Sequence, residues 1–450
     1  MHSRVFAALA LGVLLAATTE TAAASPATGD VSGEWELTTR ILGNPLHGRL
    51  TLNVEGGKLT GTLRAGRKRD VAGTVEGDRV RFEWKDRDGT TNSYEGRLQN
   101  GTLSGTVTFS GETWGGTPAS TWSARRPPSN KPAAPRTLDF EPKEFHRVFS
   151  ASIEPVLHVW PGDVVRTKTV DAGGVDWNGR TRVLGGNPQT GPFYVEGAMP
   201  GDVLAVHVRK LRLNRPSAIS DDGLVDRAVT TDWAAEHKDD NNFNDVVWDI
   251  DLATGLARPA KPTGHLGGLA VPVRPMLGCV GVAPGFGGAP VRTGDSGGIG
   301  GNMDFNEIGE GATVYLRVSQ PGALLYVGDG HALQGDGELN GNALETSLDV
   351  EFSVDVLRDK SIPGPRVENA EYLMAMGLEG SLDEAFKEAT SALASWLESD
   401  YGLTGPEAAI LLGATVEYRI AEVADRNVGV VAKVAKKYLP PPAPPAPAKP

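Results

Sequence analysis

The sequence predicts a mainly β protein of two folded units: a small antiparallel β-barrel or meander, then a larger β-sandwich-like domain with a C-terminal α/β portion. The 450 residues exceed the size of one ordinary domain. The 57 glycines and 31 prolines, with only 6% aromatic residues, favour short strands joined by turns over long helical bundles. A proline-rich stretch at 127–137 predicts a stiff linker between the two units.

The first 25 residues have the pattern of a signal peptide. Arg4 supplies positive charge and residues 5–17 are apolar. The small residues at 18–25 offer cleavage positions near Ala24. The alternative is an uncleaved anchor, but the apolar segment is short for a membrane-spanning helix. We therefore expect an exported protein, in the periplasm or outside the cell after cleavage, with no stable membrane insertion.

The region 31–126 predicts the small barrel or meander. Its short segments alternate apolar and polar residues, and turn residues such as the Gly56–Gly57 pair lie between them. We expect a packed structural or docking module rather than a ligand carrier, because a barrel of this size can be filled by its own side chains. The expected strands are 33–39, 48–54, 58–64, 70–75, 79–84, 92–98, 102–109 and 121–126.

The second domain is expected at 138–438, β-rich as far as Leu357, and is followed by a Pro/Ala-rich tail at 439–450 that cannot form a packed core. A first helix is predicted at 381–399, because its apolar residues recur on one stripe. A second helix is predicted from 405 to 412, with Pro406 in the first turn, where proline is tolerated. The stripe of the first helix is formed by Leu382, Ala385, Phe386, Ala389 and Leu393.

Charge and cysteine content exclude several classes of function. The formal net charge of -12 and the pI near 5.3 give no broad basic surface for nucleic acid or for anionic lipid. The single cysteine, Cys279, excludes an intramolecular disulfide bond. It lies in an apolar run, so we expect a buried, inert thiol and not a nucleophile.

The segment 328–338 carries the strongest signal for chemistry. It holds Asp329, Asp336, Glu338 and His331, separated by glycines that let the backbone turn tightly. It follows an apolar strand candidate, and functional side chains are often mounted where a rigid strand ends. The alternative is an ordinary Gly/Asp turn that includes a histidine.

Two other glycine-rich segments contain candidate site residues. The run 295–304 ends in Asn302 and Asp304, and it matches neither a P-loop nor a dinucleotide fingerprint. It predicts flexible backbone close to a small ligand, with a plain surface loop as the alternative. Asp171 precedes two glycines, which by itself is typical of a turn residue.

From about residue 154 to 430 the chain resembles the acetamidase/formamidase family. Several stretches in family order carry this resemblance, and together they are more specific than any one alone. They are HVWPGD at 158–163, DAGG at 171–174, NPQTGPFYVEGA at 187–198, PGD at 200–202, PMLGCVGV at 275–282, GNMD at 301–304, GALLYVGDGHA at 322–332, QGDGE at 334–338 and LET at 344–346. The resemblance implies a β-rich amidohydrolase that releases ammonia from formamide, acetamide or a similar short linear amide.

Some members of the family bind a divalent metal, so the resemblance also implies a metal site. Asp171, His331 and Glu345 are the candidate ligands, with zinc or calcium as the candidate ion. Such an ion lowers the pKa of a bound water and polarises a carbonyl group, which are two requirements of amide hydrolysis. No nucleotide or organic cofactor is expected.

The remaining polar candidates are assigned to catalysis and to substrate binding. Asp304, Asp336 and Glu338 are the catalytic candidates, and the last two would move the proton that the departing amine needs. Asn302 and Asp329 are candidates for holding the amide.

A different class of function stays open: a non-catalytic exported binding protein that keeps the amidase fold. The chain has no G-x-S-x-G nucleophile elbow, and the glycine-rich run 295–301 lacks the lysine of an amidase-signature site. The expected partner is a small-molecule amide, and assembly into a homo-oligomer is compatible with the sequence.

Overall fold

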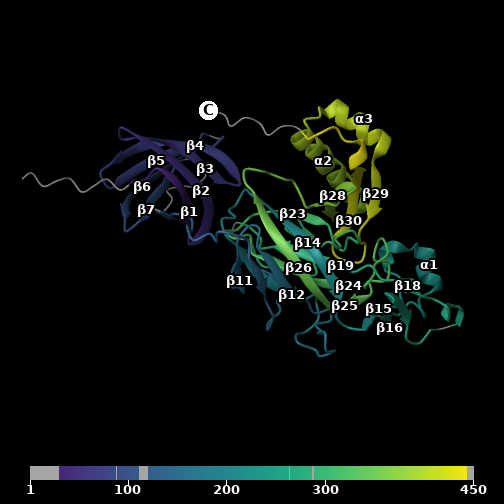
Figure 1. Ribbon diagram of the computed structural model, residues 1–450. Helices are drawn as coiled ribbons and strands as arrows, with labels where there is room; N and C mark the ends of the chain where they lie inside the picture. The colour runs from purple at the N-terminus through teal and green to yellow at the C-terminus, as the bar shows by residue number, and fades with distance from the viewer. Residues whose placement is uncertain (1–29, 88, 111–119, 263, 286–287, 443–450) are drawn as a thin grey trace, which may run out of the picture.

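The computed structural model describes residues 30–442, apart from 88, 111–119, 263 and 286–287. It confirms the mainly β fold, with an N-terminal barrel, two sheets and a helical layer near the C-terminus (Figure 1). The predicted signal peptide and residues 443–450 of the predicted tail lie outside the described residues. No described helix combines the length and the apolar character that crossing a membrane requires.

The N-terminal unit is a closed barrel in which each strand pairs with the next one, and the last strand pairs with the first. Its interior is filled by apolar side chains, including Trp35, Phe82, Tyr94 and Trp122. The rings of Phe82 and Tyr94 stack with centroids 4.7 Å apart, which adds to the area that they bury. The strands are β1 (Gly33–Ile41), β2 (Asn44–Glu55), β3 (Lys58–Ala65), β4 (Arg67–Glu76), β5 (Arg79–Lys85), β6 (Thr91–Gln99), β7 (Thr102–Phe109) and β8 (Ser120–Arg125).

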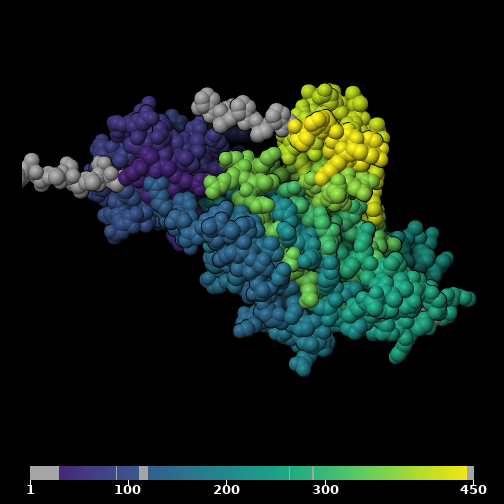
Figure 2. Space-filling view, viewed as in Figure 1, coloured from purple at the N-terminus to yellow at the C-terminus, as the bar shows by residue number. Residues whose placement is uncertain are grey.

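The barrel is joined to the second domain by a buried ion pair. Arg49 on β2 donates from Nη1 and Nη2 to the two carboxylate oxygens of Asp202, over 2.9 and 2.8 Å. The Arg49 side chain is 8% exposed and that of Asp202 is fully buried. Figure 2 shows the purple barrel lying directly against the rest of the molecule.

The second domain is built on two sheets that enclose one core. Buried side chains of both sheets meet there, as the rings of Phe193 and Phe352 do with centroids 5.2 Å apart. The first sheet runs β18 (Val271–Pro272), β17 (Leu256–Pro259), β16 (Asp245–Asp251), β15 (Ser217–Asp221), β25 (Glu345–Thr346), β24 (Leu325–His331), β19 (Met276–Val282), β22 (Gly300–Asn302) and β21 (Ser296–Gly297), with β13 (Gln189–Val195) joining β24 to β11 (Leu157–Val159). The second sheet runs β29 (Glu417–Ile420), β30 (Val428–Ala435), β28 (Tyr372–Glu379), β27 (Arg366–Glu368), β23 (Thr313–Arg317), β14 (Val203–Leu213), β26 (Leu348–Leu357), β12 (Val164–Lys168) and β9 (Thr137–Asp139).

Two helices cover the far side of the second sheet, α2 (Leu382–Tyr401) and α3 (Gly405–Thr415). Each begins with a side chain that accepts from a free backbone N–H: Ser381 caps α2 and Thr404 caps α3. Of the predicted stripe of α2, Ala385, Ala389 and Leu393 are buried, whereas Leu382 and Phe386 are 39% and 45% exposed. The remaining short elements are β10 (Val148–Phe149), β20 (Val291–Arg292), α1 (Thr231–Glu236) and the 3-10 helices η2 (Asp226–Ala228), η3 (Gly264–Leu266) and η4 (Lys436–Tyr438).

Candidate active site

Strand β24 lies inside the first sheet and supplies the centre of the site. All of its residues are buried. It pairs with β19 along one edge and with β25 and β13 along the other. Asp329 and His331 are two residues apart, so their side chains lie on the same face of the strand. Glu345 on β25 is the cross-strand partner of His331. The sheet register therefore fixes three functional groups against one another.

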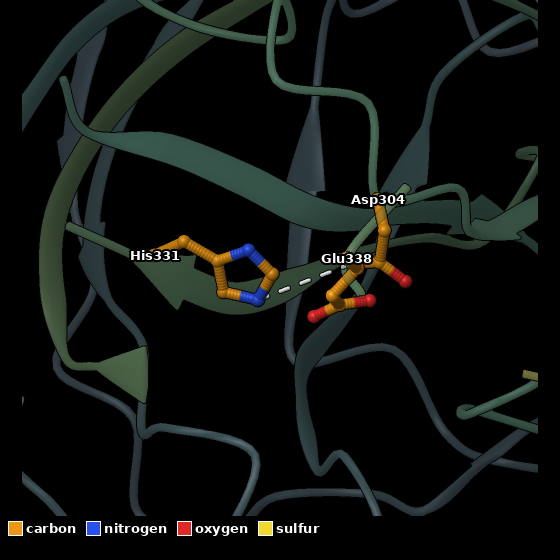
Figure 3. Close-up of side chains that lie close together, drawn as sticks. All are labelled: Asp304, His331 and Glu338. Atoms are coloured by element: carbon orange, nitrogen blue, oxygen red, sulfur yellow. Dashed lines mark ion pairs between the residues drawn. The ribbon is translucent and has the colours of Figure 1, made fainter. Parts of the chain in front are cut away.

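The His331 ring is surrounded by carboxylates. Its Nε2 atom lies 3.1 Å from Glu345 Oε1, 3.3 Å from Asp329 Oδ1 and 3.9 Å from Asp304 Oδ1. The carboxylate of Glu338 lies beside that of Asp304, and one ligand atom each of Asp304, His331 and Glu338 lies within 4.8 Å of the others (Figure 3). All five side chains are buried.

The hydrogen bonds of Gln334 decide which ring nitrogen of His331 carries the proton. Gln334 Nε2 donates to the backbone carbonyls of Asp304 and Ala421, so its Oε1 atom is left as an acceptor. That oxygen lies 2.9 Å from His331 Nδ1, which must therefore be the N–H donor. A neutral His331 then turns the lone pair of Nε2 toward the carboxylates, as a metal ligand or a general base requires.

The cluster holds more negative charge than its one histidine balances. Burial raises the pKa of Asp304 and of Glu338 well above the usual range, and raises the pKa of Glu345 to about 7. Burial lowers the pKa of His331, but the attraction of Glu345 and Asp329 outweighs it, so the net pKa lies well above its usual value. Buried carboxylates of this kind need protons or a bound cation.

Several atoms of the cluster have no hydrogen-bond partner among the described residues. They are both carboxylate oxygens of Asp304, Oδ1 of Asp329, Nε2 of His331 and Oε2 of Glu345. Buried polar atoms are nearly always paired, so this group of unpaired acceptors indicates a position for a ligand. A cavity of about 670 Å³ opens above it, with Asp329, Glu338 and Glu345 in its wall.

Comparisons with known proteins agree with this architecture. The model of the acetamidase/formamidase family matches residues 288–436. A predicted acetamidase/formamidase from Thermoanaerobacter tengcongensis is 29% identical with a TM-score of 0.58, over 68% of this chain and 97% of that one. An acetamidase from Bacillus halodurans is 27% identical with a TM-score of 0.57, over 67% of this chain and 98% of that one. An acetamidase from Yersinia enterocolitica is 28% identical with a TM-score of 0.58, over 68% of this chain and 94% of that one. The second domain is therefore similar to the acetamidase/formamidase family in sequence and in fold.

No curated protein matches the chain. The similarity to the acetamidase/formamidase family supports an amide hydrolase that acts on C–N bonds other than peptide bonds. The matched structures cover about two thirds of this chain, so the barrel is an addition to the part that they share with it.

The second domain brings five of the sequence-predicted residues into one cluster: Asp304, Asp329, His331, Glu338 and Glu345. Asn302 is in the cavity wall, where it accepts from Asn187 and donates to Asp425 over 2.6 Å. It reaches the cavity but both ends of its amide are already bonded.

Asp171 and Asp336 are not part of the cluster around His331. Asp171 is in the cavity wall, but its Oδ2 atom pairs with Arg215 over 2.7 Å and its Oδ1 atom accepts from the N–H of Val175. Asp336 turns away toward Arg419 and is held by its guanidinium group. The structure thus gives Asp171 and Asp336 partners of their own.

Sequence reasoning missed three residues that shape the site. Gln334 orients His331, and it lay inside a segment that was already recognised. Asp425 enters the cavity from the loop between β29 and β30, which carries no recognisable motif. At Gly278, a Cβ atom would lie 2.3 Å from Asp329 Oδ2 and 2.4 Å from Asp304 Oδ1, so only glycine leaves room for these carboxylates. A glycine in an otherwise apolar strand was the available signal.

Proposed function

We propose that the protein hydrolyses the C–N bond of a short linear amide such as formamide or acetamide, giving a carboxylate and ammonia, with the help of a divalent metal ion. The buried cluster around His331 is the observation that carries this proposal. The similar structures are named as acetamidases, which supports short amides as the substrate class.

The donor atoms fit a divalent cation. His331 Nε2, Asp329 and Glu345 lie close enough to share one ion, and each of the three has an unpaired buried atom. An imidazole nitrogen with carboxylate oxygens suits zinc better than calcium, since calcium prefers oxygen ligands alone. When bound, the ion would supply Lewis acidity and a water of lowered pKa.

The residues of the chain then provide the proton and the orientation that hydrolysis needs. Glu338 is in the cavity wall, and burial raises the pKa of its carboxyl group, which favours the protonated form. It is therefore the group that can protonate the departing amine. Its Oε1 atom accepts from the N–H of Ala343, which fixes the carboxyl group in place. Asp336, the other sequence candidate for this role, is held by Arg419 instead.

The deciding experiment measures ammonia release from a panel of short amides, before and after chelation and with metal added back. Release that is lost on chelation and restored by one ion is the expected result. Release that is insensitive to exhaustive chelation would remove the metal from the proposal and keep the hydrolase. No release from any amide, in protein shown to hold its metal, would contradict the hydrolase and favour a binding protein.

Substitution of His331 by alanine tests the site directly. Turnover should be abolished while the fold is kept, because the variant loses Nε2 from the centre of the cluster. His207→Ala is the matched control, since His207 lies on β14 and pairs with the exposed Asp355. Wild-type turnover in His331→Ala would contradict the site.

Export to the periplasm or the exterior is part of the same proposal. It rests on the charged, apolar and small-residue pattern of residues 1–25. N-terminal sequencing of protein from the periplasm and the medium is the test, and a mature chain that begins just after Ala24 or Ser25 is expected. A chain that starts at Met1 and stays in the cytoplasm would contradict it.

A further inference from the structure

A second cavity lies on the far side of the second sheet, the side that the helices cover, away from the site described above. Its volume is about 320 Å³, at the lower end of the range for small-molecule sites. The walls come from strands β23 and β27, the C-terminal end of α2 and the segment 357–362. Most of its lining is apolar, with Ile362, Leu373 and the ring of Trp396 among the contributors.

Arg366 is the unusual member of this lining. It is only 4% exposed, and its Nε atom has no hydrogen-bond partner among the described residues. Its guanidinium carbon lies 4.7 Å from the centre of the Trp396 ring, which is a cation–π contact and not an ion pair. Burial lowers the pKa of Arg366 to about 10, a sign of poor compensation by its surroundings.

The two acidic groups of the cavity are already paired with other cations. Asp400 accepts from Lys360 Nζ over 2.8 Å and from the indole N–H of Trp396. Glu368 pairs with Lys436 and accepts from the hydroxyl group of Tyr315. Asp400 also attracts the guanidinium group of Arg366, but this attraction does not outweigh the cost of burying its charge.

The backbone holds this guanidinium rigidly. Arg366 lies on β27, which pairs with β23 on one side and β28 on the other. The next residue, Val367, points into the core between the sheets, so Arg366 points to the opposite face, where α2 lies. A rigidly held guanidinium group in an apolar cavity is suited to bind a carboxylate, because its planar N–H donors match the two carboxylate oxygens.

We propose that this cavity binds a small organic anion, a carboxylate on a compact apolar body, with Arg366 as its counter-charge. The carboxylate accepts from the guanidinium while the apolar body lies among Ile362, Leu373 and Trp396. This site is separate from the amide cavity and does not rest on the amidase proposal.

Isothermal titration of the full chain with benzoate and with butyrate tests the site, with benzyl alcohol as the uncharged match for benzoate. We expect saturable one-to-one binding of the carboxylates that is at least about tenfold weaker in Arg366→Gln. Arg166→Gln removes the same charge at an exposed pair with Glu351 and should bind like the wild type. Arg366→Lys keeps the charge and should bind with intermediate affinity.

The far-UV circular dichroism spectrum and the urea unfolding midpoint of Arg366→Gln show whether the variant is folded, without recourse to amide hydrolysis. Equal affinity of Arg366→Gln and wild type for benzoate would overturn the proposal and assign the binding to another cavity. Absence of saturable binding at millimolar carboxylate would also overturn it. If Arg366→Gln does not fold, equal affinity of the wild type for benzoate and benzyl alcohol decides against an anion site.

Discussion

At the scale of single residues, the site depends on how His331 is held and not only on its presence. Gln334 has one acceptor to offer because two backbone carbonyls take both of its N–H groups. The Nδ1 proton of His331 is thereby fixed, and Nε2 is the nitrogen that faces the carboxylates. Groups that orient a metal-binding histidine in this way are as much a part of the site as the ligand itself.

Replacing Gln334 by leucine should weaken metal binding and activity together. The change removes the acceptor for Nδ1 and leaves that buried N–H unpaired, so we expect a loss of about 10–100-fold in metal affinity. Competition with a chromophoric chelator measures the affinity, and ammonia release measures the activity. Gln320→Leu is the control, since the side chain of Gln320 donates to the carbonyl of Pro284, outside the site. Unchanged metal affinity in Gln334→Leu would contradict an orienting role.

Gly278 gives the sharpest steric prediction. The methyl group of Gly278→Ala would collide with Asp329 and Asp304 and press on the His331 ring, 2.9 Å from Cε1. These side chains would have to shift, and a displacement of about 1 Å at a reacting group costs on the order of 100-fold in rate. The kcat for amide hydrolysis is the measurement. Gly298→Ala is the control, because a Cβ atom there meets nothing within 4 Å. Equal kcat values for the two variants would contradict the prediction, because they would show that the site tolerates the methyl group at Gly278.

At the scale of elements, local patterns predicted what is local. The eight barrel strands and the two helices were found because alternation, capping residues and apolar stripes are properties of neighbouring residues. Phe386 shows the limit of the stripe argument, since the structure leaves it exposed against Tyr418 and not in the core.

The site could be predicted only where the chain itself brings its groups together. Asp329 and His331 share a strand face, so their proximity is visible in the sequence. Asp336 is seven residues from Asp329, yet its partner is Arg419, 83 residues further on. Asp171 is likewise paired with Arg215, which no motif indicated. Ion pairs between residues far apart in the chain decide whether these carboxylates belong to the site, and a single sequence does not show which residues pair.

Asp163 anchors the start of β12 and provides a pH-dependent contribution to stability. Its side chain is 1% exposed and accepts from the guanidinium and the N–H of Arg136 and from the N–H of Trp160. Burial alone would raise its pKa, but these bonds outweigh burial and lower it. A lowered folded pKa means that the contribution is present above the unfolded pKa of about 3.9 and is lost as the pH falls through the folded value.

Asp163→Asn should therefore lower the free energy of unfolding by about 1–3 kcal/mol at pH 7. The difference from the wild type should shrink as the pH falls below about 4, where the wild-type carboxylate begins to lose its charge. Urea unfolding of both proteins across this pH range gives the comparison. Asp139→Asn is the control, because that side chain is 79% exposed. A difference that does not change with pH would rule out the charge as its cause.

At the scale of the whole molecule, the barrel is docked to the second domain and not merely tethered to it. Arg49 crosses the boundary, pairs with Asp202 and also donates to the carbonyl of Gly197. A more exposed pair, Arg358 with Glu34, lies at the same boundary. Asp202 in turn accepts from the N–H of Met199, so one carboxylate links the barrel to a turn of the second domain.

Arg49→Ala should be far more costly than the loss of an exposed pair within the barrel. It leaves the fully buried Asp202 without its counter-charge, and removing one partner of a buried pair costs about 3–5 kcal/mol. Arg97→Ala breaks the exposed pair with Asp78 and should cost less than about 1 kcal/mol. Urea unfolding is followed by tryptophan fluorescence, which reports on both domains, and by ammonia release, which reports on the second domain alone. If both variants lose equally little stability, the Arg49–Asp202 pair does not hold the barrel in place. If Arg49→Ala also weakens the second domain, the two units unfold as one.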